Sequence, residues 1–365
     1  MTRAVWRLVT LTLTGVMLVG LVASCGQAKE PAATSTPPTP KPTEAVMAPK
    51  PSVVPGEAAE MDRKIEEYSK AIALVPQDAV AYYNRGIAYY EKGDLDQAIA
   101  DYDQAVARDP QFAKAYYNRG LIYYEKGNLD QAIVDYDQAI ALDPQLAKAY
   151  GNRGFAYYDK GDLDRAIADY DQAIALDPQN AWAHYYRGIA YYDKGDLEQA
   201  ITDQDQAIAL DPQFGWAYYE RGTAYHDKGD LDQAIADYDQ AIALNPEVAL
   251  AYNNRGNAYA DKGDLDRAIA DYGHAIALDP QLAKAYNNRG NAYYDKGNLD
   301  QAIADYDQAI ALDPQYVKAY FNRGLAYTQI GEREKAISDL EKALELGLDP
   351  DVQAKAESLL DELGH

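Results

Sequence analysis

The feature that most constrains this chain is a repeat of 34 residues. From Ala79 to Pro350 the sequence repeats eight times without an insertion, and we number each unit from position 1, with Ala79 as the first. Positions 8 and 15 are glycine, position 11 is tyrosine, and positions 20 and 27 are alanine in every unit. Position 32 is proline in the first seven units. A fixed period of this length indicates a solenoid, in which each unit buries its apolar face only against its neighbours.

Local signals within a unit predict two helices, A and B. Asp143-Pro144 predicts the start of a helix A, because an N-cap acceptor precedes a proline at the first helical position. Glycine at position 15 predicts its end, because glycine readily adopts the left-handed conformation of a C-cap. Asp94, followed by Gln97, has the pattern of a capping box and predicts the start of a helix B.

The helical period predicts how the two helices pack. Positions 4, 8 and 11 fall on one face of helix A, and positions 17, 20, 24 and 27 on one face of helix B. Small residues at positions 8, 20 and 27 allow the helices to approach closely. The tyrosines at position 11 and, in six units, at position 24 are expected to fill the remaining space.

This pattern resembles the tetratricopeptide repeat, and the resemblance covers residues 79–350. It implies an all-α fold, an α-α superhelix of antiparallel helix hairpins. It also implies a concave surface, lined by helix A, on which extended peptides or partner helices bind. Upstream, residues 61–78 match only the second half of a unit and are expected to form an N-terminal cap. Downstream, residues 351–365 are expected to form a C-terminal capping helix.

The first 24 residues have the features of a bacterial export signal. Arg3 and Arg7 precede an apolar run, residues 8–22, that is too short to span a membrane. The sequence Val22-Ala23-Ser24-Cys25 resembles a lipobox, which implies lipidation of Cys25 and a membrane-anchored lipoprotein in the cell envelope, facing outside the cytoplasm. The alternative is an ordinary signal peptide with a cysteine near its cleavage site by chance.

Residues 25–60 are expected to form a disordered tether. Eight of the chain's 17 prolines lie between Pro31 and Pro55, among threonine, alanine and lysine, without any hydrophobic period. Such a segment cannot bury enough apolar surface to offset its loss of conformational entropy. Its expected role is to hold the solenoid away from the bilayer.

Composition argues against several classes of function. The net charge of −24 makes nucleic acid an improbable partner, because the surface repels phosphate. One cysteine excludes a disulfide framework, and no two of the four histidines have metal-ligand spacing on one helix. The carboxylates recur with the repeat and do not form an isolated acid–base pair. We therefore expect no enzyme activity, no cofactor, no metal and no small-molecule substrate.

A charged pair also recurs in every unit. Position 7 is arginine and position 23 is aspartate in all eight, as in Arg187 and Asp203. We expect a structural ion-pair ladder in which the aspartate partners a half-buried arginine. Arg187→Leu should therefore be tolerated or cost little, whereas Asp203→Leu should leave a partly buried arginine unpaired. Glu67 occupies the matching place in the half-repeat and is expected to serve Arg85. The alternative is an exposed row of arginines that binds acidic ligands.

Positions 2, 5, 9, 12 and 13 of helix A point away from the core face and are expected to line the groove, with position 6 at its edge. Position 12 is usually tyrosine, position 13 is acidic in seven units, and position 6 is asparagine in six. A groove of this composition suits a protein or peptide partner with basic and apolar side chains.

Repeats 4 and 5 depart from the template and are the candidate binding site. They carry the only tryptophans after the signal segment, and both lack the asparagine at position 6. Repeat 5 also changes positions 9 and 12, and further tyrosines nearby could complete an aromatic strip. The candidate residues are Trp182, Tyr185, Tyr186, Tyr192, Trp216, Tyr219, Glu220, Thr223 and His226. The alternative is sequence drift, or tryptophans that pack between neighbouring A helices.

Three functions follow from these features. The first is a lipid-anchored scaffold that recruits partner proteins through the groove. The second is a narrower role in envelope assembly, similar to that of pilotin-like repeat lipoproteins. The third is a structural solenoid without a specific ligand.

The lipobox generates a direct prediction. Metabolic labelling with palmitate should mark the wild-type protein and leave Cys25→Ser unlabelled, because the acyl chains attach through that sulfur. Fractionation should place the wild type with membranes. Equal labelling of the two proteins, or a wild type found only in the soluble fraction, would contradict the anchor.

Overall fold

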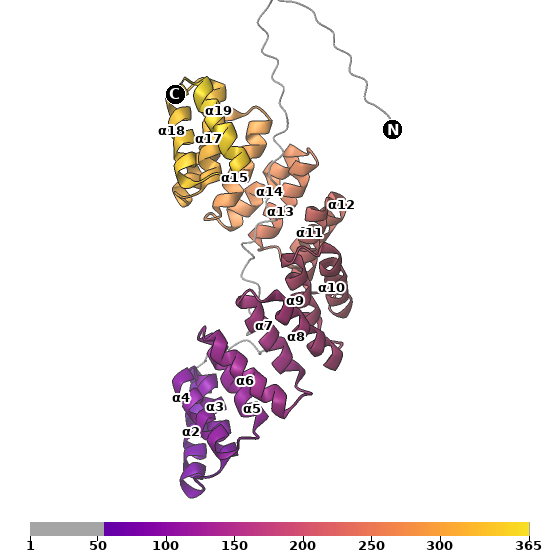
Figure 1. Cartoon of the computed structure of the whole chain (residues 1–365), viewed down its shortest axis with the longest axis vertical. Helices are drawn as coiled ribbons and strands as arrows, with labels where there is room; N and C mark the ends of the chain where they lie inside the picture. Colours follow the sequence, from indigo (N-terminus) through magenta and orange to yellow (C-terminus); the bar gives the residue numbers. More distant parts are fainter. Residues whose placement is uncertain (1–54, 365) are drawn as a thin grey trace, which may run out of the picture.

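The computed structural model describes residues 55–364. The export signal, Cys25 and most of the predicted tether lie outside these residues. Every regular element between residues 55 and 364 is an α-helix, and the helices stack into a curved solenoid with one concave side (Figure 1). The all-α superhelix expected from the repeat is confirmed.

Each unit is a hairpin of one A helix and one B helix. The A helices are α3 (Ala79–Lys92), α5 (Ala113–Glu125), α7 (Ala147–Asp159), α9 (Ala181–Asp193), α11 (Gly215–Lys228), α13 (Ala249–Asp261), α15 (Ala283–Asp295) and α17 (Val317–Ile330). The B helices are α4 (Leu95–Arg108), α6 (Leu129–Leu142), α8 (Leu163–Leu176), α10 (Leu197–Leu210), α12 (Leu231–Leu244), α14 (Leu265–Leu278), α16 (Leu299–Leu312) and α18 (Arg333–Leu346).

A single helix lies at each end of the stack. Helix α2 (Pro55–Leu74) packs on α3 and begins inside the segment that we assigned to the tether. Helix α19 (Pro350–Glu362) packs on α18, where Ala356 and Leu360 are buried in one apolar cluster with Phe321 and Leu340. These helices cover apolar faces that the terminal hairpins would otherwise expose.

The Asp-Pro pair ends helix B and does not start helix A, so that prediction was wrong. Helix α6 stops at Leu142, and Asp143 has an extended backbone, with φ −134° and ψ 86°. The Asp143 carboxylate accepts a hydrogen bond from the Gln145 N–H at 3.1 Å and stabilises the turn into α7. The reason is steric: a proline disfavours the helical conformation of the residue before it.

The other two helix-end predictions are confirmed. Glycine at position 15 has a positive φ in all eight units, from 77° at Gly127 to 90° at Gly229. Asp94 caps α4, since its Oδ1 accepts a hydrogen bond from the Gln97 N–H at 3.3 Å.

The core lies between helices A and B, but its most buried positions differ in part from those expected. Tyrosine at position 24 is buried, and a Cβ added at Gly290 would lie 2.6 Å from Tyr306 Cε1, which explains the glycine at position 8. In helix A, positions 3 and 10 are buried in every unit, whereas the tyrosine at position 11 is usually half-exposed. Position 3 is alanine in all eight units, a signal that the sequence analysis missed.

The ion pair between positions 7 and 23 is present in every unit. The arginine donates from Nε and Nη2 to both oxygens of the aspartate, at 2.6–2.8 Å. In six units Nη1 also donates to the aspartate at position 25 of the preceding unit, as Arg187 does to Asp171 at 2.6 Å. Each of these arginines therefore joins two repeats.

The half-repeat uses a different residue from the one predicted. Arg85 Nη1 donates to the Ser69 hydroxyl at 3.0 Å, so the prediction of Glu67 was wrong. Ser69 occupies position 25 of the half-repeat, and Nη1 reaches position 25 of the preceding unit, not position 23.

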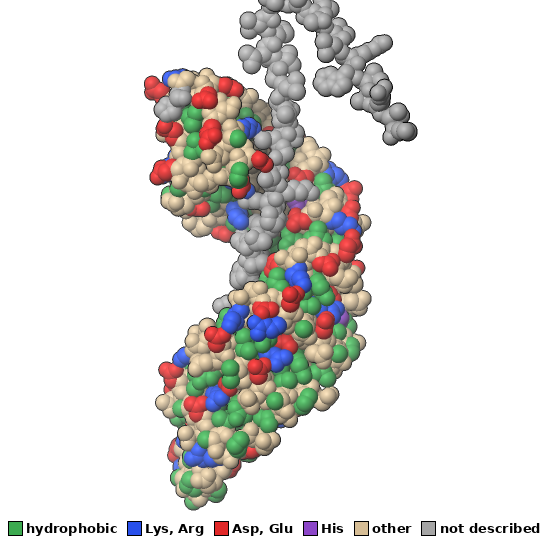
Figure 2. Space-filling view, viewed as in Figure 1, with side chains coloured by type: hydrophobic (Ala, Val, Ile, Leu, Met, Phe, Trp, Pro, Cys, Tyr) green, Lys and Arg blue, Asp and Glu red, His purple; other side chains and the backbone are tan. Residues whose placement is uncertain are grey.

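A second set of ion pairs joins the repeats on the outer surface. Lys126 pairs with Asp96, and Lys160 with Asp130, so that the lysine at position 14 contacts a carboxylate at position 18 of the preceding unit. Carboxylates and basic side chains accordingly lie side by side over much of the face in Figure 2. Exposed pairs of this kind contribute little to stability individually.

Within the ladder, the carboxylate is the more buried partner. The Asp203 side chain is 3% exposed and the Arg187 side chain 21% exposed. From the sequence we expected the loss of the aspartate to destabilise the protein more than the loss of the arginine. The structure reverses this order, because an arginine that loses its own aspartate keeps the carboxylate of the preceding unit.

The deeper burial of the aspartate predicts that substitutions of the two partners in repeat 3 destabilise the protein unequally. Arg153→Leu should destabilise the protein by about 3–5 kcal/mol, because it leaves the Asp169 carboxylate buried and unpaired. Asp169→Leu should cost less, because Arg153 still pairs with Asp137. The double variant should be more stable than Arg153→Leu alone. Urea unfolding of the full-length protein measures all three, and an equal or larger cost for Asp169→Leu would contradict the assignment.

Candidate binding groove

The concave side of the solenoid is formed by the A helices. Successive A helices contact one another, as α7 does α9 and α11 does α13, while α10 and α12 lie on the convex side (Figure 1). Positions 5 and 6 lie where adjacent A helices meet, and positions 12 and 13 lie at their C-terminal ends. Side chains from these positions form two rows that run from repeat to repeat.

The first row consists of hydrogen bonds from side-chain amides. The asparagine at position 6 donates from Nδ2 to the side chain at position 5 of the preceding unit. These pairs are Asn118 to Tyr83 Oη at 3.1 Å, Asn152 to Tyr117 Oη at 3.0 Å, Asn254 to Tyr219 Oη at 2.8 Å, Asn288 to Asn253 Oδ1 at 3.2 Å and Asn322 to Asn287 Oδ1 at 3.1 Å. The row thus sets the spacing of the A helices.

The second row consists of tyrosines and carboxylates. The hydroxyl at position 12 donates to the carboxylate at position 13 of the next unit, in the pairs Tyr124–Asp159, Tyr158–Asp193 and Tyr192–Asp227, each at 2.5 Å. Burial and the adjacent carboxylate raise the pKa of each of these tyrosines, so they remain neutral donors at any ordinary pH. Asp159, Asp193 and Asp261 are exposed, and the row presents negative charge to the groove.

Histidine replaces tyrosine in this row in repeat 5. His226 Nε2 lies 3.0 Å from Asp261 Oδ2, and Nδ1 lies 3.5 Å from Asp227 Oδ1. Burial alone would lower the pKa of His226, but the two carboxylates outweigh it and raise the pKa to about 9. The side chain is therefore an imidazolium at neutral pH, and the chain places its own cation between two carboxylates of the row.

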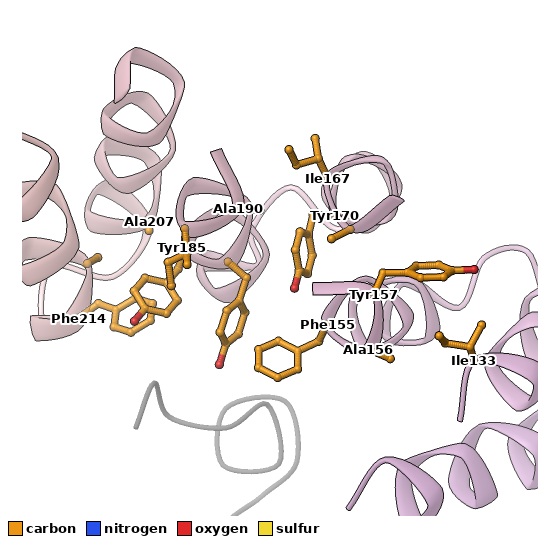
Figure 3. Close-up of a cluster of buried hydrophobic side chains, with 14 residues drawn as sticks. Ile133, Phe155, Ala156, Tyr157, Ile167, Tyr170, Tyr185, Ala190, Ala207 and Phe214 are labelled. Carbon is orange, nitrogen blue, oxygen red and sulfur yellow. The ribbon is translucent and has the colours of Figure 1, made fainter. Parts of the chain in front are cut away.

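The structure buries most of the predicted aromatic strip. Tyr185, Tyr186 and Tyr219 are at most 5% exposed. The ring of Tyr185 packs at a tilt against that of Phe214, with 4.8 Å between the ring centroids (Figure 3). The ring centroid of the half-buried Trp182 lies 4.3 Å from that of Phe214, and the ring centroid of Trp216 lies 5.9 Å from that of Tyr219. The prediction of an exposed strip was wrong, because positions 5 and 6 face the junction between A helices.

One substitution in this cluster has a steric explanation. Position 5 of repeat 3 is Gly151, so the residue at position 6 of repeat 4 has no hydroxyl or amide to contact there. A Cβ at Gly151 would meet nothing within 4 Å. Tyr186 packs its ring edge-on against Phe155, 4.9 Å away, instead of continuing the amide row.

Two other candidates make internal hydrogen bonds. Thr223 Oγ1 donates to the Tyr219 carbonyl at 3.0 Å and accepts from the Tyr238 hydroxyl at 3.2 Å. Tyr192 belongs to the tyrosine–carboxylate row. Of the predicted site residues, the structure therefore brings Tyr192 and His226 to the groove and leaves Thr223 in the core.

Glu220 is the most unusual candidate. It occupies position 6 of repeat 5, opposite Tyr185, where six other units have an asparagine. Its side chain is buried, and Oε1 has no hydrogen-bond partner among the described residues. Burial, and secondly the Asp193 carboxylate, raise the pKa of Glu220 to about 8.

Repeat 4 carries a further departure from the repeat pattern, which we did not predict from the sequence. Position 24 of repeat 4 is Gln204, where six units have tyrosine. Its Nε2 donates to the Tyr185 carbonyl at 3.0 Å, and its Oε1 has no partner among residues 55–364. The signal was present in the template, since repeats 4 and 8 alone depart from tyrosine there.

Sequence comparison decides the family. A family model described as a TPR repeat matches residues 65–93, 156–195, 188–229, 222–263, 256–297 and 290–331. Models described as a tetratricopeptide repeat match residues 83–147, 135–168 and 317–347. This chain is a tetratricopeptide-repeat protein. A search of curated proteins gave no match.

Solved structures share the fold of this TPR protein. A chain of the APC/C hetero-tetramer Cut9–Hcn1 is 20% identical, with a TM-score of 0.54 over 72% of this chain and 52% of that one. The TPR protein therefore spans about half the length of that relative. A tetratricopeptide-repeat protein from Parabacteroides merdae is 21% identical, with a TM-score of 0.54 over 68% of this chain and 99% of its own. PilF of Pseudomonas aeruginosa is 21% identical, with a TM-score of 0.51 over 58% and 96%.

The site of this TPR protein offers binding groups. The rows supply carboxylates, hydroxyls and amides, and the A helices of repeats 4 and 5 add the half-buried indoles of Trp182 and Trp216. Among the described residues, no group of three histidine, cysteine or acidic side chains is placed to hold a metal ion. None of the helices from α2 to α19 is long and apolar enough to cross a bilayer.

The shifted pKa of Glu220 predicts a pH dependence of stability. Its folded-state pKa of about 8 exceeds the ordinary value of 4.5, so its contribution is greatest below pH 4.5 and is lost as the pH rises through 8. The stability of the wild type relative to Glu220→Gln should therefore fall between pH 5 and pH 8. Urea midpoints across this window measure the difference, with the exposed Glu247→Gln as control. Parallel curves for the wild type and Glu220→Gln would contradict the shift.

Proposed function

We propose that this TPR protein is a non-enzymatic scaffold that binds an extended segment of a partner protein in its concave groove. The observation that carries the proposal is the row of carboxylates at position 13. Three of them, Asp159, Asp193 and Asp261, are exposed along the groove, and each is held in place by a side chain of the preceding repeat. Fixed charges at regular spacing suit a partner with basic side chains at regular spacing.

The rest of the groove supports the same class of partner. Net charge −24 steers cationic segments toward the solenoid. Trp182 and Trp216 are half-buried near the N-terminal ends of α9 and α11, and each leaves part of an indole for apolar contact at the end of the helix opposite the acidic row. Because the paired rows hold these groups rigid, a bound segment would lose its own conformational entropy but little of the scaffold's.

Attachment to a membrane completes the proposed function. The lipobox-like Val22-Ala23-Ser24-Cys25 would anchor the chain outside the cytoplasm, in a bacterial envelope. The proline-rich segment would then extend the solenoid away from the lipid, so that the groove remains accessible to partner proteins.

A structural solenoid without a specific ligand is the second candidate. It is favoured by the internal pairing of the two rows and by the burial of the tyrosines that we expected to be free. In this case the acidic groove would serve solubility and stacking alone.

Removal of the three exposed carboxylates distinguishes these functions. The combined variant Asp159→Asn, Asp193→Asn and Asp261→Asn keeps an acceptor for each donor of the preceding unit. It should bind basic-apolar peptides on a peptide array at least about tenfold more weakly than the wild type, because three attractive charges are lost. Titration of the best peptides with the full-length protein in detergent gives the dissociation constants.

A matched variant controls for net charge. Asp130→Asn, Asp164→Asn and Asp232→Asn remove the same number of charges from B helices, where the aspartates pair with lysines. This variant should retain the wild-type affinity. If neither wild type nor variants bind any peptide, or if both variants bind equally well, the groove is not the binding surface.

A further inference from the structure

The junction of repeats 4 and 5 contains three buried polar atoms that have no hydrogen-bond partner among the described residues. They are Glu220 Oε1, the Tyr185 hydroxyl and Gln204 Oε1. Glu220 lies opposite Tyr185 across the junction, and Gln204 lies within the hairpin of repeat 4, where its Nε2 donates to the Tyr185 carbonyl. Each buried polar atom without a partner costs about 1–3 kcal/mol, so three together require an explanation.

The next junction shows the paired form of the same arrangement. There Asn254 Nδ2 donates to the Tyr219 hydroxyl at 2.8 Å. At the repeat 4–5 junction, Glu220 replaces that asparagine and brings acceptor oxygens in place of the amide donor. The packing is otherwise preserved, because Tyr185 remains buried against Phe214. The amide donor that the next junction has is therefore absent here.

Among residues 55–364, no cationic side chain pairs with Glu220. Arg187 and Arg221, the nearest repeat arginines in sequence, each bind two aspartates. His226 lies between Asp227 and Asp261. The Asp193 carboxylate repels an ionised Glu220. The neutral groups that face it are the hydroxyls of Tyr158, Tyr185, Tyr192, Tyr219 and Tyr238.

We propose that Glu220, Asp193 and the Tyr185 hydroxyl form a socket for one cationic side chain, an arginine guanidinium or a lysine ammonium, of the segment bound in the groove. This inference rests on the proposed function and names the chemistry of its central contact. An entering cation would lie between two carboxylates, as the imidazolium of His226 does one repeat further along. It would also donate to the acceptor atoms that lack a partner.

Binding would couple to a proton. At neutral pH Glu220 is largely protonated, because its pKa is about 8. A cation in the socket favours the carboxylate, so the Glu220 proton leaves to solvent as the cation enters, and the net charge of the socket is conserved. The socket should therefore take up its cation more tightly at pH 8.5 than at pH 6.5.

The test uses small cations, so that it does not depend on knowing the partner. The Glu220 carboxyl is titrated by ¹³C NMR in the full-length protein, with Glu220→Gln used to assign its resonance. The probes are methylguanidinium chloride and methylammonium chloride, which distinguish arginine from lysine. N-methylurea with sodium chloride at equal ionic strength is the neutral control. Saturating cation should lower the apparent pKa of Glu220 by about one unit or more, which corresponds to a tenfold preference for the ionised form.

A variant that restores the asparagine of position 6 separates cation binding by Glu220 from a purely structural role. Glu220→Asn re-creates the amide–tyrosine pair of the next junction, so it should fold and should unfold at a higher temperature than the wild type. It should nevertheless lose at least about tenfold in affinity for array peptides with a central arginine or lysine. Replacement of that residue by citrulline or acetyl-lysine should weaken binding to the wild type and not to Glu220→Asn.

The outcomes distinguish the socket from the groove. An unchanged pKa of Glu220 in both cations overturns the socket, and so does unchanged affinity of Glu220→Asn for basic peptides that the wild type binds. If those peptides still depend on Asp159 and Asp261, which lie outside the socket, the groove function survives without it. If the small cations shift the pKa but no peptide binds, the socket stands and the groove function fails.

Discussion

The solenoid depends most on the ion pairs made by the arginine at position 7. In six units it binds the aspartate of its own B helix through two nitrogens and an aspartate of the preceding repeat through the third. One planar group thus fixes the pairing of helices within a hairpin and the register between hairpins. The fork geometry explains why arginine recurs without exception, since lysine could not hold both carboxylates in fixed directions. Where the second aspartate is absent, at Gly273, the chain still keeps the pair of Arg289 with Asp305.

The same logic of contact from one unit to the next operates on the concave side. Amides at position 6 reach position 5 of the preceding repeat, and hydroxyls at position 12 reach carboxylates at position 13 of the following one. These rows hold polar side chains rigid on a surface that would otherwise be mobile. They also make departures conspicuous: a residue that interrupts a row either fills space, as Tyr186 does opposite Gly151, or leaves polar atoms without partners, as Glu220 does.

The proposed socket at Glu220 would give a repeat protein a specific site without changing its fold. The surrounding repeats supply the rigid frame, and one substitution replaces a donor by an acid in a buried place. Burial then keeps the acid protonated near neutral pH, and the nearby Asp193 adds to that effect. Polar atoms without partners lower the stability of this junction, and binding sites commonly carry such a local loss of stability.

The sequence by itself determined the repeat, the helix hairpins, the left-handed glycine at position 15 and the pairing of Arg187 with Asp203. These features depend on local backbone preferences and on a period that repeats eight times. Only the tertiary structure decided which side of each ion pair is buried, that Asp143-Pro144 ends a helix, and that Tyr185 and Tyr219 lie in the core. It also revealed the partnerless atoms of Glu220 and Gln204. Those properties depend on contacts between successive repeats, and the superhelical stacking that creates these contacts is not contained in the period of one unit.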